Sequence, residues 1–291
     1  MLKVYFNLLR VPQWIKNFFI FVPLIFSKHL FDIGYFKTSL LGFAIFCMIS
    51  SSIYIINDLI DIEEDRVHPT KKFRPIAAGS ISERLANVIA VILALLTFSL
   101  LPLTNFYFSS TVIAYYIITI LYSYKLKHIV ILDVFTIAAG FMIRILAGAF
   151  IIDVEISSWL ILTTMFISLF LAVMKRRSEL KHTGNNENTT TRKVLAHYSN
   201  EFVDQMSTVT SAGVIICYAL YTVSQRTVTV FKTENLIYTT PFVVFGIFRY
   251  MYLVYVGQKG ENAAEIILSD LPMIVNLVLY IAAVTLILYK L

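Results

Sequence analysis

Long apolar segments recur along the whole chain, and they restrict its fold more than any other feature of the sequence. A segment of about 17–25 apolar residues can cross a hydrocarbon core of about 30 Å as a helix. Only 14% of the residues are charged, against about 25% in soluble domains. The sequence therefore predicts an all-α polytopic membrane protein, a single domain over residues 1–291. Its nine expected spans lie at about 14–33, 38–56, 85–102, 106–123, 130–151, 157–174, 205–225, 237–256 and 271–289.

Basic residues are concentrated in alternate connections between these spans. Lys and Arg favour the cytoplasmic side of a membrane protein, which predicts a cytoplasmic N-terminus and two long cytoplasmic loops, 57–84 and 175–204. We expect the protein in the cell (inner) membrane, with its active site facing the cytoplasm. The net charge of +6 follows from this bias, so we expect no nucleic-acid partner. The Asn- and Thr-rich composition of 183–191 predicts disorder there.

One cytoplasmic stretch, "NDLIDIEEDRVHPTKKFRPIAAG" at 57–79, is far more charged than its apolar surroundings. Asp58, Asp61 and Asp65 are spaced i, i+3 and i+7, which places them on one face of a helix, whereas Glu63 points away. Convergent carboxylates with open coordination positions suit Mg²⁺, which binds through one or two carboxylates plus substrate phosphates. The spacing thus favours a metal site for a phosphate-bearing substrate.

A simpler interpretation of the same stretch is a charge-balanced surface loop. Lys71, Lys72 and Arg74 follow the acids closely enough to neutralise them, and surface ion pairs by themselves indicate little about function.

The same residues also carry a family resemblance. "NDLIDIEED" fits the NDxxDxxxD signature of the UbiA superfamily of intramembrane prenyltransferases, with Asn57, Asp58, Asp61 and Asp65 at its fixed positions. The resemblance implies nine transmembrane helices around a central cavity open to the cytoplasm. It also implies that the three aspartates are the catalytic and metal-binding residues, with Mg²⁺ as cofactor.

Three longer stretches resemble one branch of that superfamily, the decaprenyl-phosphate phosphoribosyltransferases. They read "LRVPQWIKNFFIFVPLIF", "DRVHPTKKFRPIAAG" and "LYSYKLKHIVILDVFTIAAGFMIRILAGAF", so the resemblance covers nearly the whole chain. It implies transfer of a 5-phosphoribosyl group from phosphoribosyl diphosphate to a polyprenyl phosphate, with release of diphosphate.

The chain departs from the wider superfamily after the sixth span. A second Asp-rich motif is typical there, but this sequence reads "KRRSELKH", with Lys175, Arg176 and Arg177 where acids would stand and only Glu179 acidic. These cations either set membrane topology or bind phosphate oxygens directly.

Other candidates lie at membrane edges or inside apolar runs. Lys16 is either a topology signal or a phosphate contact, and Lys127 and Tyr122 either snorkel or line a polar pocket. Arg144 lies inside an apolar run, where a charge costs at least about 2.5–3.5 kcal/mol, so it is either half of a structural ion pair or part of a substrate cavity. The complete set of predicted substrate-binding residues is Lys16, Asn17, Asn57, Lys71, Arg74, Tyr122, Lys127, Arg144, Lys175, Arg176 and Glu179.

Two other functions remain open on the sequence. An aromatic prenyltransferase that uses prenyl diphosphate would share the fold and the first motif. A transporter would use intramembrane Asp and Arg along an ion path, but here the acids cluster at one face. The wide apolar faces suit either a monomer or a homo-oligomer.

Overall fold

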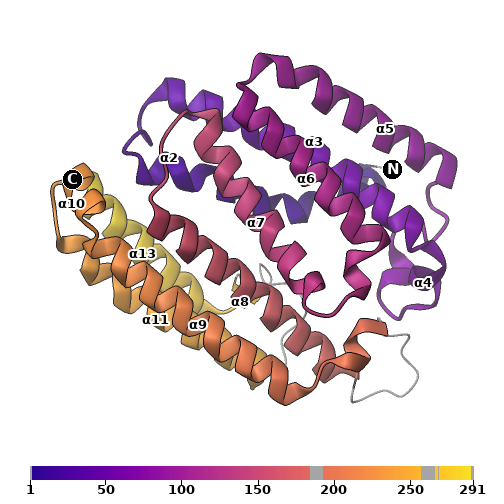
Figure 1. Cartoon of the computed structure of the whole chain (residues 1–291). Helices are drawn as coiled ribbons and strands as arrows, with labels where there is room; N and C mark the ends of the chain where they lie inside the picture. The colour runs from indigo at the N-terminus through magenta and orange to yellow at the C-terminus, as the bar shows by residue number, and fades with distance from the viewer. Residues whose placement is uncertain (1, 184–192, 257–265, 268, 290–291) are drawn as a thin grey trace. The chain divides into compact units, whose positions relative to one another are not determined.

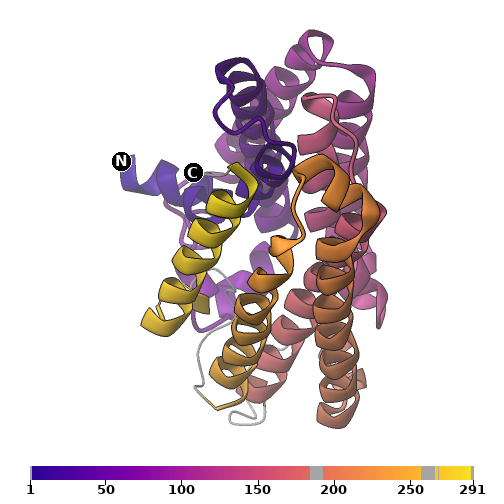
Figure 2. The ribbon, with the colours of Figure 1, turned by 90° about the vertical axis from the view of Figure 1, so that its left-hand side faces the viewer.

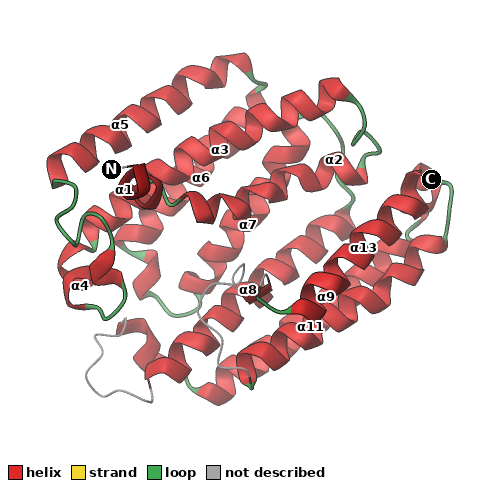
Figure 3. Cartoon of the chain, turned by 180° about the vertical axis from the view of Figure 1, so that it is seen from behind, coloured by secondary structure: helices red, strands yellow, loops and turns green. Residues whose placement is uncertain are grey.

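The computed structural model describes residues 2–183, 193–256, 266–267 and 269–289 (Figure 1). All regular structure in these ranges is helical (Figure 3). By length and composition, eight helices could cross a membrane, or nine if the bent pair Leu2–Leu8 and Val11–Phe26 is one span. The predicted all-α membrane fold is confirmed.

The helices follow one another with short connections. In chain order the described elements are α1 (Leu2–Leu8), η1 (Val11–Phe21), α2 (Val22–Phe26), α3 (Ile33–Ile60), α4 (Ile62–Val67), η2 (Lys71–Phe73), α5 (Glu83–Leu100), η3 (Leu101–Leu103), α6 (Phe106–Tyr124), η4 (Leu126–His128), α7 (Leu132–Ile151), α8 (Ser158–Thr183), η5 (Lys193–His197), α9 (Asn200–Val223), α10 (Gln225–Phe231), η6 (Asn235–Thr239), α11 (Thr240–Tyr255) and α13 (Leu271–Tyr289).

Several long helices begin where a polar side chain caps the first turn. Oxygens of Asp32, Ser82, Asn105 and Ser199 accept hydrogen bonds from backbone N–H groups at the starts of α3, α5, α6 and α9. Such caps satisfy donors that have no partner within the helix. They fix these helix starts close to the edges of the predicted apolar runs.

The first span, predicted at 14–33, has other bounds in the structure, where the apolar helical segments run from Leu2 to Phe26. They are bent by 50° at the break between α1 and η1, where Arg10 adopts a left-handed conformation with φ 51° and ψ 44°. Pro12 follows at the start of η1, and proline has no N–H to continue a helical ladder. An apolar run alone does not reveal such a break.

The two predicted cytoplasmic loops contain more helix than the sequence indicated. Within 57–84, α3 continues to Ile60 and α4 follows, and within 175–204, α8 continues to Thr183. Ion pairs one turn apart support these polar extensions, as between Arg66 and Glu63, 2.6 Å. The predicted disorder at 183–191 concerns residues that lie, from 184 on, outside the described ranges.

One compact unit comprises residues 1–136, 143–155 and 186–194. In this unit α3 packs against α5, α6 and η1 (Figure 1). Phe46 and Ile49 of α3 meet Phe108 and Tyr115 of α6 in its larger apolar core. Gly148 of α7 lies so close to η1 that an added Cβ would stand 2.1 Å from the carbonyl oxygen of Ile20, so the absence of a side chain permits this close packing.

The second compact unit comprises residues 137–142, 156–185 and 195–291. Here α8 packs on α9, and α11 contacts α8, α9 and α13; Figure 2 shows α9 and α11 side by side. Phe170, Met174, Val214 and Tyr250 form the centre of its core.

Candidate active site

The acidic segment lies across the junction of α3 and α4. Asp61 ends α3 with φ −92° and ψ 12°, but the helical hydrogen bonds continue, from Asp61 N to the Asn57 carbonyl, 3.0 Å, and from Asp65 N to the Asp61 carbonyl, 2.8 Å. The predicted helical spacing of Asp58, Asp61 and Asp65 is therefore kept through the junction. Glu63 points into solvent, 78% exposed, as expected.

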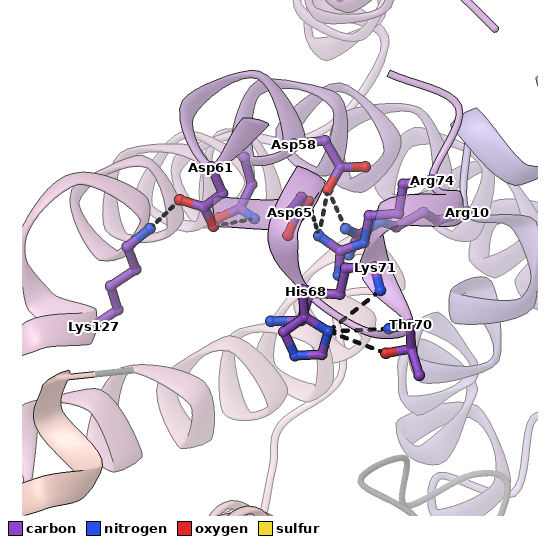
Figure 4. A network of polar contacts seen from close by, with 10 residues as sticks. Arg10, Asp58, Asp61, Asp65, His68, Thr70, Lys71, Arg74 and Lys127 are labelled. Atoms are coloured by element: carbon purple, nitrogen blue, oxygen red, sulfur yellow. Dashed lines mark hydrogen bonds and ion pairs between the residues drawn. The ribbon is translucent and has the colours of Figure 1, made fainter. Parts of the chain in front are cut away.

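Arg74 joins two of the three carboxylates. Its Nη1 donates to Asp58 Oδ1, 3.0 Å, and to Asp65 Oδ2, 2.5 Å, and both aspartates are buried. Figure 4 shows Arg74 reaching from the loop after α4 toward both acids. The sequence predicted that Arg74 would lie near the acids, and the structure brings them together.

Asp61 is directed away from that pair, toward η4 (Figure 4). The expected convergence of all three carboxylates is therefore wrong for this structure, because Asp61 has its own basic partner. Lys127 Nζ donates to Asp61 Oδ1, and Asn57 Nδ2 donates to Asp61 Oδ2, 3.2 Å. Lys127 is buried and lies beside the first motif through its contact with Asp61. Tyr122, five residues earlier on α6, is half-buried, and its proposed place in the pocket stays a prediction.

Arg10 is the site residue that sequence reasoning missed. Its guanidinium forms an ion pair with Asp58 and lies 5.0 Å from the ring centroid of Tyr54. In the sequence Arg10 is one of several basic residues at the N-terminal membrane edge, where topology alone accounts for a positive charge. Its position directly before "VPQWIKN" was the available signal.

The loop between α4 and η2 is ordered by His68. His68 Nδ1 accepts from the backbone N–H groups of Thr70 and Lys71, each at 3.3 Å (Figure 4). His68 is therefore a hydrogen-bonding residue of this loop. The turn sets the course of the chain toward Arg74, and Lys71 is half-buried within it; binding of substrate by Lys71 stays a prediction.

A second polar group is buried between α7, η1 and α6. Arg144 Nε donates to Asn17 Oδ1 and its Nη2 to Tyr115 Oη, both at 2.7 Å. Asn17 Nδ2 in turn donates to Ser50 Oγ on α3, 3.3 Å. Lys16, which precedes Asn17 in the sequence, is half-buried. Arg144 and Asn17 thus connect helices, and a role for them or Lys16 in binding substrate stays a prediction.

The basic residues of α8 have their partners within the second unit. Arg176 is fully buried and pairs with Glu179, whose other oxygen lies 3.9 Å from Lys175 Nζ. Arg177 Nε donates to Asp204 Oδ1 of α9, 2.7 Å. Lys175 keeps 34% of its side chain exposed. Whether Lys175, Arg176 and Glu179 bind substrate is not decided by these contacts.

The acidic segment has the donor chemistry of a site for a hard divalent cation. Asp58, Asp61, Asp65 and Asn57 offer only oxygen ligands suited to Mg²⁺. Each carboxylate holds a basic partner instead, and within the described ranges no group of three or more His, Cys, Asp or Glu side chains is arranged to hold a metal ion. A metal ion at these residues would compete with the basic partners for the carboxylates.

Helices of membrane-spanning length and an acidic segment paired with basic side chains define a helical membrane protein with a cluster of paired charges. Residues 18–268 match the model of the UbiA prenyltransferase family, and the chain belongs to that family.

Similar proteins agree with this assignment. The chain is 34% identical over 220 residues to the decaprenyl-phosphate phosphoribosyltransferase of Mycolicibacterium smegmatis, covering 74% of this chain and 69% of that protein. It is 34% identical over 277 residues to the decaprenyl-phosphate phosphoribosyltransferase of Corynebacterium glutamicum, covering 90% and 80%. A UbiA homologue from Archaeoglobus fulgidus, bound to GPP and Mg²⁺, superposes with a TM-score of 0.72 at 19% identity, covering 98% and 99% of the two chains. The chain is thus a transferase with the UbiA fold.

Proposed function

We propose that this transferase moves a 5-phosphoribosyl group from phosphoribosyl diphosphate to a polyprenyl phosphate. The observation that carries the proposal is the gathering of Arg10, Arg74 and Lys127 on the acidic segment. A donor and an acceptor that both carry phosphate need such cations in addition to any metal. The names of the relatives from M. smegmatis and C. glutamicum support the same substrates.

The reaction exchanges one bond at the anomeric carbon. The bond from this carbon to the diphosphate oxygen breaks and its electron pair leaves with diphosphate, while an oxygen of the lipid phosphate forms the new bond from the opposite face. This displacement inverts the configuration and gives a β-ribosyl phosphate. No strong general base is needed, because a phosphate monoester is already largely ionised near pH 7, with a second pKa of about 6.

The residues of the acidic segment would contribute by neutralising and positioning charge. Mg²⁺ held by Asp58, Asp61 and Asp65 would supply neutralisation of the leaving diphosphate. Arg74 and Lys127 would bind phosphate oxygens and hold two anions together that otherwise repel each other. In the second unit, Lys175 and Arg176 are proposed to bind a phosphate group, with Glu179 orienting Arg176 through their ion pair.

The proposal also includes the place of the reaction. Because Lys and Arg are concentrated in the connections that contain the acidic segment, this end of the helices is proposed to face the cytoplasm of the inner membrane. A soluble sugar diphosphate would reach the site from that side, and the lipid phosphate would enter from the bilayer.

The test compares two pairs of substrates with the purified protein in lipid. One arm contains radiolabelled phosphoribosyl diphosphate with polyprenyl phosphate, and the other contains labelled prenyl diphosphate with an aromatic acid. We expect a labelled product only in the first arm, as an acid-labile ribosyl phosphate in the lipid phase. Product in the second arm alone would identify an aromatic prenyltransferase and overturn the proposal.

The basic residues of α8 provide a second, independent test. Replacement of Arg176 by Ala should lower the apparent affinity for a phosphate-bearing substrate by about ten- to hundredfold, since a charge-assisted contact contributes about 1.5–3 kcal/mol. Arg177→Gln is the matched control, because Arg177 is bound to Asp204 and Asn200 of α9. Equal effects of the two variants on affinity would indicate a purely structural role for Arg176.

A further inference from the structure

Arg10 is held at the acidic segment by contacts that do not involve Asp58. Ser51 Oγ of α3 accepts from Trp14 Nε1, 3.0 Å, and donates to the carbonyl oxygen of Leu9, 2.8 Å. The hydroxyl therefore fixes the chain on both sides of Arg10. Ser51, Tyr54 and Asp58 are spaced i, i+3 and i+7 along α3, so they lie on one face of this helix. That face contacts the backbone next to Arg10 through Ser51, and the Arg10 guanidinium through Tyr54 and Asp58.

The backbone of Arg10 supports a specific placement of its side chain. Arg10 has φ 51°, a left-handed conformation that non-glycine residues adopt only at a cost in free energy. Such conformations persist where the surrounding contacts determine them, and they cluster at binding sites. Here the conformation turns the chain from α1 into η1 and directs the guanidinium at Asp58.

The charges of the site balance before any ligand is bound. Arg10, Arg74 and Lys127 face Asp58, Asp61 and Asp65. If the carboxylates turned to a divalent cation, the three basic side chains would lose their counterions beside an added double positive charge. A diphosphate, which carries several negative charges, restores the balance. Metal and diphosphate should therefore bind together more favourably than the metal binds alone.

Asp58 has one more basic partner than its charge requires. It accepts from both Arg74 and Arg10, whereas Arg74 also holds Asp65. The side chain of Arg10 is 20% exposed, so its outer edge is accessible to a ligand. We propose that Arg10 is a diphosphate-binding residue, which exchanges Asp58 for the donor's diphosphate oxygens. This inference rests on the proposed function and adds to it a phosphate-binding residue outside the family motif.

The test measures binding of inorganic pyrophosphate to the full-length protein in detergent by isothermal titration calorimetry, with and without Mg²⁺. Arg10→Gln should weaken binding of pyrophosphate in the presence of Mg²⁺ by about ten- to hundredfold. The same variant should bind Mg²⁺ alone more tightly than the wild type, because Asp58 has lost a competing cation. A counterion that only neutralised Asp58 would instead leave the pyrophosphate affinity unchanged or raise it.

Two further variants complete the experiment. Arg66→Gln removes the same charge from the neighbouring α4, where Arg66 pairs with the exposed Glu63 and Glu83, and it should change neither affinity. Arg10→Lys keeps the charge but not the fork of donors, so its pyrophosphate affinity should fall between those of wild type and Arg10→Gln. Folding of each variant is checked by thermal unfolding.

Failure of this inference differs from failure of the proposed function. A pyrophosphate affinity within about twofold of wild type in Arg10→Gln, or in Arg10→Met if the first variant does not fold, overturns the role of Arg10. If the wild type still labels polyprenyl phosphate, the function stands. A wild-type protein that binds neither pyrophosphate nor phosphoribosyl diphosphate overturns both.

Discussion

Asp61 and Lys127 are 66 positions apart in the sequence, yet the ammonium group of Lys127 donates to a carboxylate oxygen of Asp61. Their side chains are only 14% and 7% exposed. The contact joins the end of α3 to the short η4 segment between α6 and α7 (Figure 4). With so little water around them, each charge depends on the other for compensation.

Substitution of either Asp61 or Lys127 should lower the stability of the protein, and the effects of the two single substitutions should not be additive. We expect Asp61→Asn and Lys127→Met each to lower the free energy of unfolding by about 1–3 kcal/mol, because each leaves a nearly buried partner without its charge. The double variant should lose less than the sum. Denaturant unfolding in detergent measures all three values, and additive losses would show that the two side chains are energetically independent.

The three aspartates should be needed for turnover. Asp58→Asn, Asp61→Asn and Asp65→Asn should each lower kcat by about 100-fold or more, since each removes a charge that the reaction requires next to the diphosphate. Glu63→Gln is the control, because this neighbouring acid is 78% exposed and pairs only with Arg66 among the contacts described. The prediction fails if two of the aspartate variants retain wild-type turnover.

Removal of divalent metal should abolish activity without unfolding the protein. The acids already hold Arg10, Arg74 and Lys127 as counterions, so the metal-free fold has no uncompensated carboxylate cluster. We expect EDTA to stop turnover, Mg²⁺ to restore it, and Tm to stay within about 2 °C throughout, which in a chain of this size corresponds to a change in stability of about 1 kcal/mol or less. A large fall in Tm with EDTA would instead identify a structural metal.

Loss of Arg144 should destabilise the first unit. Arg144→Leu removes the partner of Asn17 Oδ1 and of Tyr115 Oη, two polar groups in a buried environment, and should cost about 2–4 kcal/mol. Tyr115→Phe removes one of these bonds and should cost about 1 kcal/mol. Thermal and denaturant unfolding measure whether Arg144→Leu is less stable than Tyr115→Phe. An Arg144→Leu protein as stable as the wild type would contradict the prediction.

Gly148 should not tolerate a side chain. An added Cβ would meet the backbone of Ile20 at 2.1 Å, and backbone cannot yield as a side chain can, so Gly148→Ala should lower stability by about 1–3 kcal/mol. At Gly246 the nearest atom to such a Cβ is 3.4 Å away, on the side chain of Asn276. Gly246→Ala should therefore be nearly neutral in the same unfolding measurements.

The sequence predicts what depends on local pattern. Eight of the expected spans are helices in the structure, because the length and apolar character of a segment are sufficient to predict a membrane-spanning helix. The spacing of Asp58, Asp61 and Asp65 survives because helical hydrogen bonds continue through Asp61. Glu63 lies on the exposed face for the same reason.

Contacts between residues distant in the sequence could not be predicted from local pattern. The pairing of Arg10 with Asp58 requires the left-handed turn at Arg10 and the hydroxyl of Ser51, and no apolar pattern encodes either. The burial of Arg176 against Glu179 could not be predicted either. A basic run beside a membrane has the same composition whether it faces water or the protein interior.

The unbroken hydrogen bonding across Asp61 also determines which changes in chain length this region can accept. An inserted residue between Asp58 and Asp65 would rotate one carboxylate by about 100° about the helix axis relative to the other, and the single guanidinium nitrogen of Arg74 could no longer reach both. Exposed Glu63 and Glu64 can be exchanged for other residues without this effect. Here the number of intervening residues matters more than their identity, and a graft of this segment into another helix must retain its length.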